Sequence, residues 1–227
     1  MTGKGGSGTI FISGCNLGCV FCQNHHISQG NPSQGDIVST SVFAKFCLNL
    51  EIRGAENINI VTGSHAVPAI VEGIVAAKNK GLQIPVIWNS SAYESQEAFE
   101  LLADHVDIYL PDLKTLDSQV ALKLFDAPDY PEIAAAAILK MMEMSDRVFI
   151  RHLILPGYLE STRSVLQWFS QHARGRAILS LMSQYYPAGR NPYAKDMPKR
   201  RLTKDEYDTA IGWFEEFGIT DGLIQPW

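Results

Sequence analysis

The stretch Gly14-Cys15-Asn16-Leu17-Gly18-Cys19-Val20-Phe21-Cys22-Gln23 contains three of the four cysteines of the chain. Their spacing, C-x3-C-x2-C, lets one short loop present three thiolates to the corners of an iron–sulfur cube and supplies no fourth ligand. One iron would remain open to a substrate or cofactor, just as a catalytic zinc keeps an unfilled position. The spacing therefore predicts a reactive 4Fe-4S cluster held by Cys15, Cys19 and Cys22.

Two other uses of close cysteines compete with a cluster. A zinc site usually has four Cys or His ligands, and His25 and His26 follow the loop, although adjacent histidines point in different directions. A disulfide needs an oxidising compartment, and the sequence shows no secretory signal peptide that would predict one. Both alternatives stay open at this point. The fourth cysteine, Cys47, lies in an apolar helical pattern and is expected to be a free, buried thiol.

Length and charge limit the possible classes of function. A chain of 227 residues suits one large or two small domains. Nineteen basic residues against 24 acidic ones give a net charge of -5, so no basic field predicts binding to nucleic acid or to an anionic membrane. No apolar stretch reaches the roughly 18 residues of a membrane span. We therefore expect a soluble protein, and cluster-forming thiols without a targeting segment fit the cytoplasm.

Apolar, β-branched runs alternate with helical patterns along the chain, which is typical of βα units around a parallel sheet. Strands are expected at residues 9–13, 57–62, 85–89, 107–110, 147–155 and 177–182. Helices are expected at residues 40–53, 68–80, 95–105, 118–123, 131–144 and 161–172, and a capping box of Thr203 and Glu206 begins a last helix that ends at Gly218. The units predict an α/β fold, an open, partial (β/α)6 TIM-like barrel.

Polar and special residues gather directly after the predicted strands. In parallel βα architectures, active sites are built at the carboxyl ends of the strands, so this distribution predicts an enzyme. The residues concerned are Gly14, Cys15, Thr62, Gly63, Ser64, His65, Asn89, Ser90, Ser91, Asp112, Lys114, His152, Pro156, Gly157, Ser183, Gln184 and Tyr185.

The aromatic Phe21 before the third cysteine completes the pattern C-x3-C-x-aromatic-C, which resembles the radical S-adenosylmethionine (SAM) superfamily. The resemblance implies a partial barrel of the radical SAM type and two cofactors, a 4Fe-4S cluster and SAM. In that superfamily the open iron chelates SAM, and an electron from the cluster splits it into methionine and a 5'-deoxyadenosyl radical. The radical then abstracts a hydrogen atom from a substrate.

A narrower resemblance covers nearly the whole chain. The segments that carry it are residues 6–11, 89–94, 107–114, 127–131 and 151–157. They look like the radical SAM proteins described as similar to pyruvate formate-lyase activating enzyme. This resemblance implies one radical SAM core over residues 1–227. Relatives commonly have a further cysteine-bearing stretch upstream, so we expect that an N-terminal segment could be missing.

Residue by residue, the resemblance implies a SAM site. Phe21 and the backbone around Gln23 match the wall that faces the adenine. The turn Thr62-Gly63-Ser64-His65 stands where the family has Gly-Gly-Glu, whose backbone meets the SAM amino group. Ser64 and His65 depart from that motif, so any contact is expected through the backbone, and Gly63 permits a close approach.

The same resemblance implies a catalytic role for Asp112 and Lys114. They match an Asp-Leu-Lys motif on the SAM and substrate side of the pocket and are the expected catalytic residues. Strand alternation puts both on one face, with Leu113 turned away. Asn89 and Ser90 match a site near a monovalent cation, but Asn89 lacks the acidic charge, so no cation is predicted. The remaining expected cofactor contacts are Ser91, His152 and Gln184, with Arg151 at the same mouth.

The implied partners are a low-potential electron donor of the flavodoxin or ferredoxin type and, as protein substrate, a glycyl-radical enzyme. In the activating enzymes the hydrogen atom comes from a backbone glycine, and the open side of a partial barrel would admit a polypeptide loop. Two other classes of function stay open. One is a radical SAM enzyme that acts on a small molecule, and the other is a non-catalytic protein that binds the cluster or SAM.

Overall fold

The computed structural model describes residues 3–30, 35–187 and 198–227. In these ranges seven parallel strands follow one another in chain order. They are β1 (Gly8–Phe11), β2 (Ile58–Val61), β3 (Val86–Ser90), β4 (Ile108–Pro111), β5 (Phe149–Leu153), β6 (Ile178–Met182) and β7 (Gly222–Ile224). The order β1-β2-β3-β4 forms one sheet and β5-β6-β7 another.

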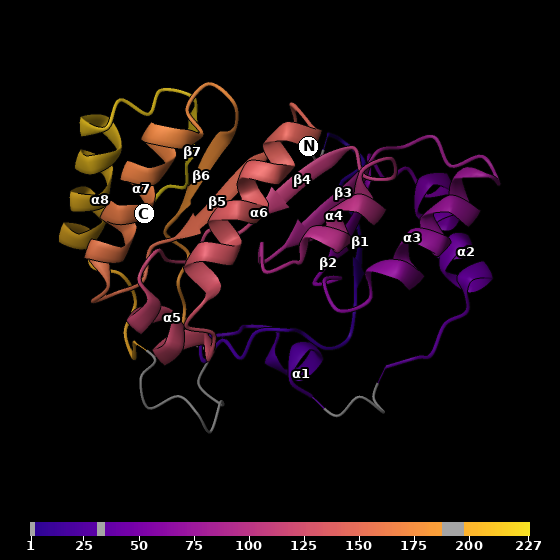
Figure 1. Cartoon of the computed structure of the whole chain (residues 1–227), viewed down its shortest axis with the longest axis horizontal. Helices are drawn as coiled ribbons and strands as arrows, with labels where there is room; N and C mark the ends of the chain where they lie inside the picture. The colour runs from indigo at the N-terminus through magenta and orange to yellow at the C-terminus, as the bar shows by residue number, and fades with distance from the viewer. Residues whose placement is uncertain (1–2, 31–34, 188–197) are drawn as a thin grey trace.

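The two sheets join into one arc between β4 and β5. Tyr109 pairs with Val148 and Asp112 with Arg151 in isolated parallel bridges, and the Leu113 N–H donates to the Arg151 carbonyl at 2.9 Å. Among the described residues β1 and β7 pair with no further strand, so each forms an edge of the arc. The expected partial barrel is confirmed as an open α/β arc (Figure 1).

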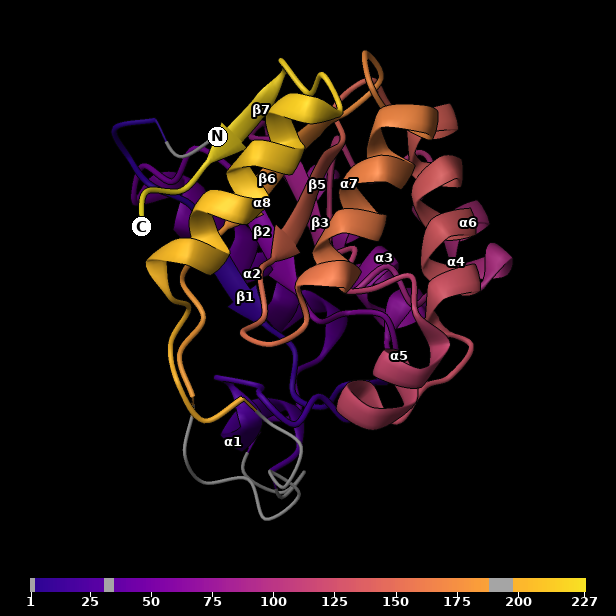
Figure 2. The ribbon, with the colours of Figure 1, turned by 90° about the vertical axis from the view of Figure 1, so that its left-hand side faces the viewer.

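Helices cover the outer side of the arc, with α2 and α3 over its first strands and α7 and α8 over its last (Figure 1, Figure 2). The helices are α1 (His25–Ser28), α2 (Thr40–Ile52), α3 (Val67–Lys78), α4 (Gln96–Leu102), α5 (Ser118–Phe125), α6 (Tyr130–Met144), α7 (Leu159–His172) and α8 (Lys204–Glu216). Their apolar faces pack on the outward strand residues, as Ile58 and Ile60 of β2 illustrate with no exposed surface. Burial of these faces provides most of the apolar core.

On the inner side of the arc, one layer of strand residues is apolar, and the next layer toward the carboxyl ends borders a cavity. Ile87, Ile108 and Leu110 form a small buried cluster against Phe149. The next inward residue on β3 is Asn89, which lies beside a cavity. The apolar cluster therefore closes the inside of the arc below the carboxyl ends of the strands.

The predicted strands and helices are confirmed, apart from shifts of a few residues at their ends. The capping box of Thr203 and Glu206 is present, and Gly218 has a φ of 65° directly after α8. Two elements are additional, the short helix α1 and the three-residue strand β7, so the arc has one strand more than predicted. Within the described ranges, no helix is both long and apolar enough to cross a membrane.

Candidate active site

A cavity of about 420 Å³ lies inside the arc at the carboxyl ends of the strands. The segment with the three cysteines and α1 passes beneath these ends in Figure 1. Residues from β1 to β5 and from the cysteine loop line the cavity. They include Thr9, Phe11, Cys15, Leu17, Cys19, Cys22, Asn59, Val61, Thr62, Asn89, Ser90, Ser91, Asp112, Lys114 and Arg151.

Three free thiols border this cavity, those of Cys15, Cys19 and Cys22. No three His, Cys, Asp or Glu side chains in the described ranges are grouped closely enough to hold a single metal ion. A 4Fe-4S cube with one open iron needs three thiolates at separate iron corners, and the three free thiols beside the cavity supply that set of donors. His25 instead places its Nδ1 atom 3.3 Å from the Cys22 carbonyl oxygen.

Burial of the cysteine loop keeps an unbound thiol there in its neutral form. Burial raises the pKa of Cys19 to about 12, although the positive charge of Lys114 acts in the opposite direction. A thiol in this setting stays protonated at neutral pH unless a metal ion binds it, since coordination deprotonates a thiol outright. Cys47 is also fully buried but lies in α2, outside the cavity lining, as expected for a structural thiol.

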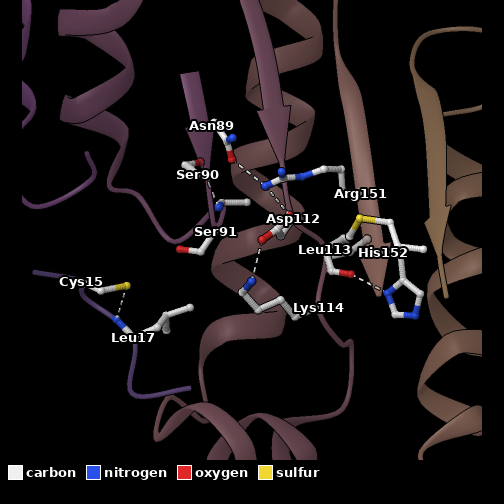
Figure 3. Close-up of polar contacts among 12 residues, drawn as sticks. Cys15, Leu17, Asn89, Ser90, Ser91, Asp112, Leu113, Lys114, Arg151 and His152 are labelled. Carbon is white, nitrogen blue, oxygen red and sulfur yellow. Dashed lines mark hydrogen bonds and ion pairs between the residues drawn. The ribbon is translucent and has the colours of Figure 1, made fainter. Parts of the chain in front are cut away.

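Opposite the cysteines, Asp112 carries two ion pairs. Lys114 Nζ lies 2.7 Å from Asp112 Oδ2, and an Arg151 guanidinium nitrogen lies 2.7 Å from Oδ1. The same guanidinium nitrogen donates to Asn89 Oδ1 at 2.6 Å (Figure 3). Burial raises the pKa of Asp112, but Arg151 and Lys114 outweigh it and hold the pKa below its ordinary value. The carboxylate therefore stays ionised at neutral pH.

We call Asn89, Asp112, Lys114 and Arg151 the charged wall of the cavity. They come from β3, the end of β4 and β5, and the Asp112–Arg151 bridge sets them side by side at the join of the two sheets. Asp112 and Lys114 share a face and Leu113 is fully buried, which confirms the expected alternation. Arg151 Nε remains buried without a hydrogen-bond partner among the placed residues.

Tyr130 holds the end of β4 from behind. Its hydroxyl lies 2.7 Å from the Asp112 carbonyl oxygen and 3.0 Å from that of Ser91, and it accepts from the Lys114 N–H. The side chain has no exposed surface, and it begins α6. This role was not predicted, because a tyrosine before Pro131 is typical of an ordinary helix start.

The turn after β2 directs the side chains of Ser64 and His65 away from the cavity. Thr62 lines the cavity and has a positive φ of 62°. Ser64 donates to Glu94 Oε1 at 2.6 Å, while His65 Nε2 lies 2.8 Å from the Ser13 carbonyl oxygen. A Cβ atom on Gly63 would lie 2.6 Å from Trp88, so the absent side chain makes room for the indole ring. Any ligand contact by this turn is thus left to its backbone and to Thr62.

Glu94 anchors that turn and was not foreseen. Its Oε1 atom accepts from Ser64 and, at 3.3 Å, from the Trp88 indole. Burial raises the pKa of Glu94, and these hydrogen bonds act in the opposite direction. The carboxyl group lies behind the cavity wall and supports the backbone of the turn.

Besides Gly63 and Ser64, four expected cofactor contacts lie outside the cavity lining, namely Phe21, Gln23, His152 and Gln184. His152 is buried, with Nδ1 2.7 Å from the Leu113 carbonyl oxygen and Nε2 2.9 Å from Thr162 Oγ1. Figure 3 shows Arg151 and His152 leaving β5 in opposite directions, so the histidine lies on the helix side and not in the cavity. Phe21 packs edge-on against Phe125 and Tyr185.

Gln23 and Gln184 line a second cavity, of about 840 Å³, beyond the ends of β6 and β7. Gln184 Oε1 accepts from Gln225 Nε2 at 3.0 Å. Since Gln23 directly follows Cys22, this second cavity begins next to the cysteine loop. The remaining expected contacts, Asn89 and Ser91, do line the first cavity.

A face without charges lies at the other side of the first cavity. Thr9 and Phe11 of β1 stand in register with Asn59 and Val61 of β2, and all four line the cavity. We call these four residues the neutral wall. None was predicted as a site residue, because single polar residues in short apolar strands give no functional signal in a sequence.

The radical SAM superfamily model matches residues 9–169. The uncharacterised protein MJ0674 of Methanocaldococcus jannaschii is 31% identical over 221 residues, which cover 94% of this chain and 63% of that protein. The chain thus spans somewhat under two thirds of the length of this curated relative.

Two solved structures illustrate the likeness in fold. Streptococcus suis SuiB bound to S-adenosylmethionine has a TM-score of 0.70 at 14% identity, covering 97% of this chain and 51% of SuiB. A domain of pyruvate-formate lyase-activating enzyme from Bacteroides vulgatus has a TM-score of 0.52 at 17% identity, covering 70% of this chain and 91% of that domain. With its three cysteines beside the cavity of an open parallel arc, this chain belongs to the radical SAM superfamily, whose cofactors are a 4Fe-4S cluster and SAM.

Proposed function

We propose that the protein, as one radical SAM core over residues 1–227, abstracts a hydrogen atom from a backbone glycine of a partner polypeptide. Cys15, Cys19 and Cys22 would hold the cluster, which when bound would supply the one electron for reductive cleavage of SAM, with methionine and 5'-deoxyadenosine as the products after hydrogen transfer. A low-potential flavodoxin or ferredoxin supplies the electron. Likeness to an activating-enzyme domain and the Asp-Leu-Lys motif support this assignment.

The residues of the cavity have separate tasks in this proposal. Cys15, Cys19 and Cys22 hold the cluster at one side. Lys114 and Arg151 together exceed the charge of Asp112 by one, and this positive charge suits the carboxylate of SAM. No side chain has to act as a general base, so the protein mainly orients its cofactors and excludes water.

The observation that carries the choice of a polypeptide is the open arc. Neither β1 nor β7 has a further neighbour among the described residues, so the inside of the arc has two strand edges instead of a closed wall. Phe11 on β1 is 49% exposed although it lines the cavity, which means that the cavity is accessible beside this edge. A loop of another protein could enter where a closed barrel would exclude it.

The test uses anaerobically reconstituted protein, dithionite, SAM and a blocked peptide whose central glycine carries two deuterium atoms on Cα. The expected result is formation of methionine together with deuterium in 5'-deoxyadenosine. Failure of cluster-loaded protein to cleave SAM would contradict an enzymatic role. Cleavage without transfer of deuterium from any glycine peptide would contradict the polypeptide substrate and favour a small molecule.

A further inference from the structure

Asn59 stands out on the neutral wall because its carboxamide is unsatisfied. Its neighbours Ile58 and Ile60 are buried on the helix side, whereas Asn59 faces inward and lines the cavity. Its Oδ1 atom is buried and has no hydrogen-bond partner among the placed residues. Such an atom lowers the stability of the folded state, and folded proteins contain few of them.

A second asparagine shows what a satisfied carboxamide looks like in the same part of the fold. Asn57 precedes β2 and is 2% exposed, and its Oδ1 accepts from the Ser7 hydroxyl at 2.6 Å. The side-chain oxygen of Asn57 thus has a hydrogen-bond donor within the protein, whereas that of Asn59 has none among the placed residues. The difference suggests that the partner of Asn59 comes from a ligand.

The surroundings of Asn59 restrict the chemistry of that ligand. The strand sequences of β1 and β2, Gly-Thr-Ile-Phe and Ile-Asn-Ile-Val, contain no charged residue. Phe11 and Val61 supply apolar surface next to the carboxamide. A charged ligand group placed here would lose its hydration without a counter-ion, so the wall favours a neutral polar group.

We propose that Asn59 binds a backbone peptide group of the substrate, next to the glycine that loses its hydrogen atom. This inference rests on the polypeptide substrate proposed above. A carboxamide offers both an acceptor and donors, and a peptide group offers the complementary pair, N–H and C=O. The match holds for either assignment of the oxygen and nitrogen of Asn59. Phe11, at the open edge, then contacts the apolar part of the bound segment.

The experiment compares the wild type with Asn59→Leu and, as matched control, Asn57→Leu. The probe is an acetylated, amidated peptide with a central glycine, with a series of analogues in which each N–H near the glycine is replaced by an ester oxygen. The holoproteins are measured for probe affinity and for resistance to urea. An ester swap removes one donor and leaves the shape of the peptide nearly unchanged.

Asn59→Leu is expected to bind the parent peptide about tenfold more weakly while keeping or increasing resistance to urea, because the unsatisfied group is gone. One ester analogue should bind the wild type about tenfold more weakly than the parent peptide and show no such difference with Asn59→Leu. Asn57→Leu should lose stability and keep both the wild-type affinity for the peptide and the preference for the amide.

Other outcomes separate the two proposals. If Asn59→Leu loses as much stability as Asn57→Leu, or if no ester analogue distinguishes it from the wild type, the role of Asn59 is wrong although the polypeptide substrate stands. If the cluster-loaded wild type cleaves SAM but binds none of the peptides, the polypeptide substrate is wrong and this inference fails with it.

Discussion

The two walls of the cavity differ in whether ion pairs within the protein hold their polar side chains. In the charged wall, ion pairs within the protein join Asp112 to both Lys114 and Arg151, and Arg151 also reaches Asn89, although Arg151 Nε has no hydrogen-bond partner among the placed residues. In the neutral wall, Asn59 has a buried oxygen without a partner and Phe11 is about half exposed. One wall is therefore organised before a ligand arrives, as a cofactor site requires. The other is incomplete, as expected where the partner comes from outside.

The largest effect should follow from a change to the cysteine loop, because cleavage of SAM requires the cluster. Cys19→Ala is expected to abolish the cluster, since two remaining thiolates cannot hold the cube that three hold. SAM cleavage should be lost with it. Iron and sulfide are counted per chain after anaerobic reconstitution.

The matched control is Cys47→Ala, which removes a buried thiol outside the cavity lining. This variant should retain a full cluster and show only the small loss of stability that a shortened core side chain causes. A cluster that survives in Cys19→Ala, or one that disappears in Cys47→Ala, would contradict the ligand assignment.

The next largest effect concerns the charged wall. Asp112→Asn leaves Lys114 and Arg151 facing each other without their carboxylate. The free energy of unfolding should fall by about 2–3 kcal/mol, less than the roughly 3–5 kcal/mol of a fully buried pair, because the Asp112 side chain is about one fifth exposed. Urea unfolding of the two proteins at neutral pH measures this difference.

The difference in unfolding free energy between the wild type and Asp112→Asn should also depend on pH. The pKa of Asp112 in the folded state lies below its ordinary value of 3.8, because the two cations outweigh the effect of burial. Its contribution is thus fully present above that ordinary value and is lost as the pH falls through the lower, folded-state value. The gap between the wild type and Asp112→Asn should shrink only at that acidic end. A gap that already closes near neutral pH would contradict the depressed pKa.

The sequence was sufficient for features that depend on spacing and alternation. The cysteine spacing predicted the loop that borders the cavity, and period-two alternation predicted that Asp112 and Lys114 share a face. It placed both Arg151 and His152 at the mouth of the site, whereas only Arg151 lines the cavity. It could not choose between these neighbours, because a shift of one residue in a strand exchanges its two faces. Their directions are set by the bridge from β4 to β5, which joins residues about 40 positions apart.

Asn59 and β7 were not predicted, for a different reason. A single asparagine in a four-residue apolar strand has no periodic signal, and its unsatisfied oxygen is apparent only when every neighbour is placed. β7 has three residues, and its Leu223 is 58% exposed, so it lacks the buried alternation that identifies a strand.

The smallest effects are expected in the turn that follows the neutral wall, where Gly63 and His65 can be compared. Gly63→Ala should lower the free energy of unfolding by about 1–3 kcal/mol, because its Cβ would lie 2.6 Å from Trp88 and 2.7 Å from Ile70 in a filled core. His65→Ala removes one contact to the Ser13 carbonyl oxygen at the surface and should cost about 1 kcal/mol or less. Because the His65 side chain faces away from the cavity, SAM affinity should stay within a few-fold of the wild type. Urea unfolding and equilibrium binding of SAM to the reconstituted proteins measure both quantities. Loss of SAM binding in His65→Ala, with Gly63→Ala unchanged in stability and affinity, would make the histidine a direct ligand and move the boundary of the SAM site into this turn.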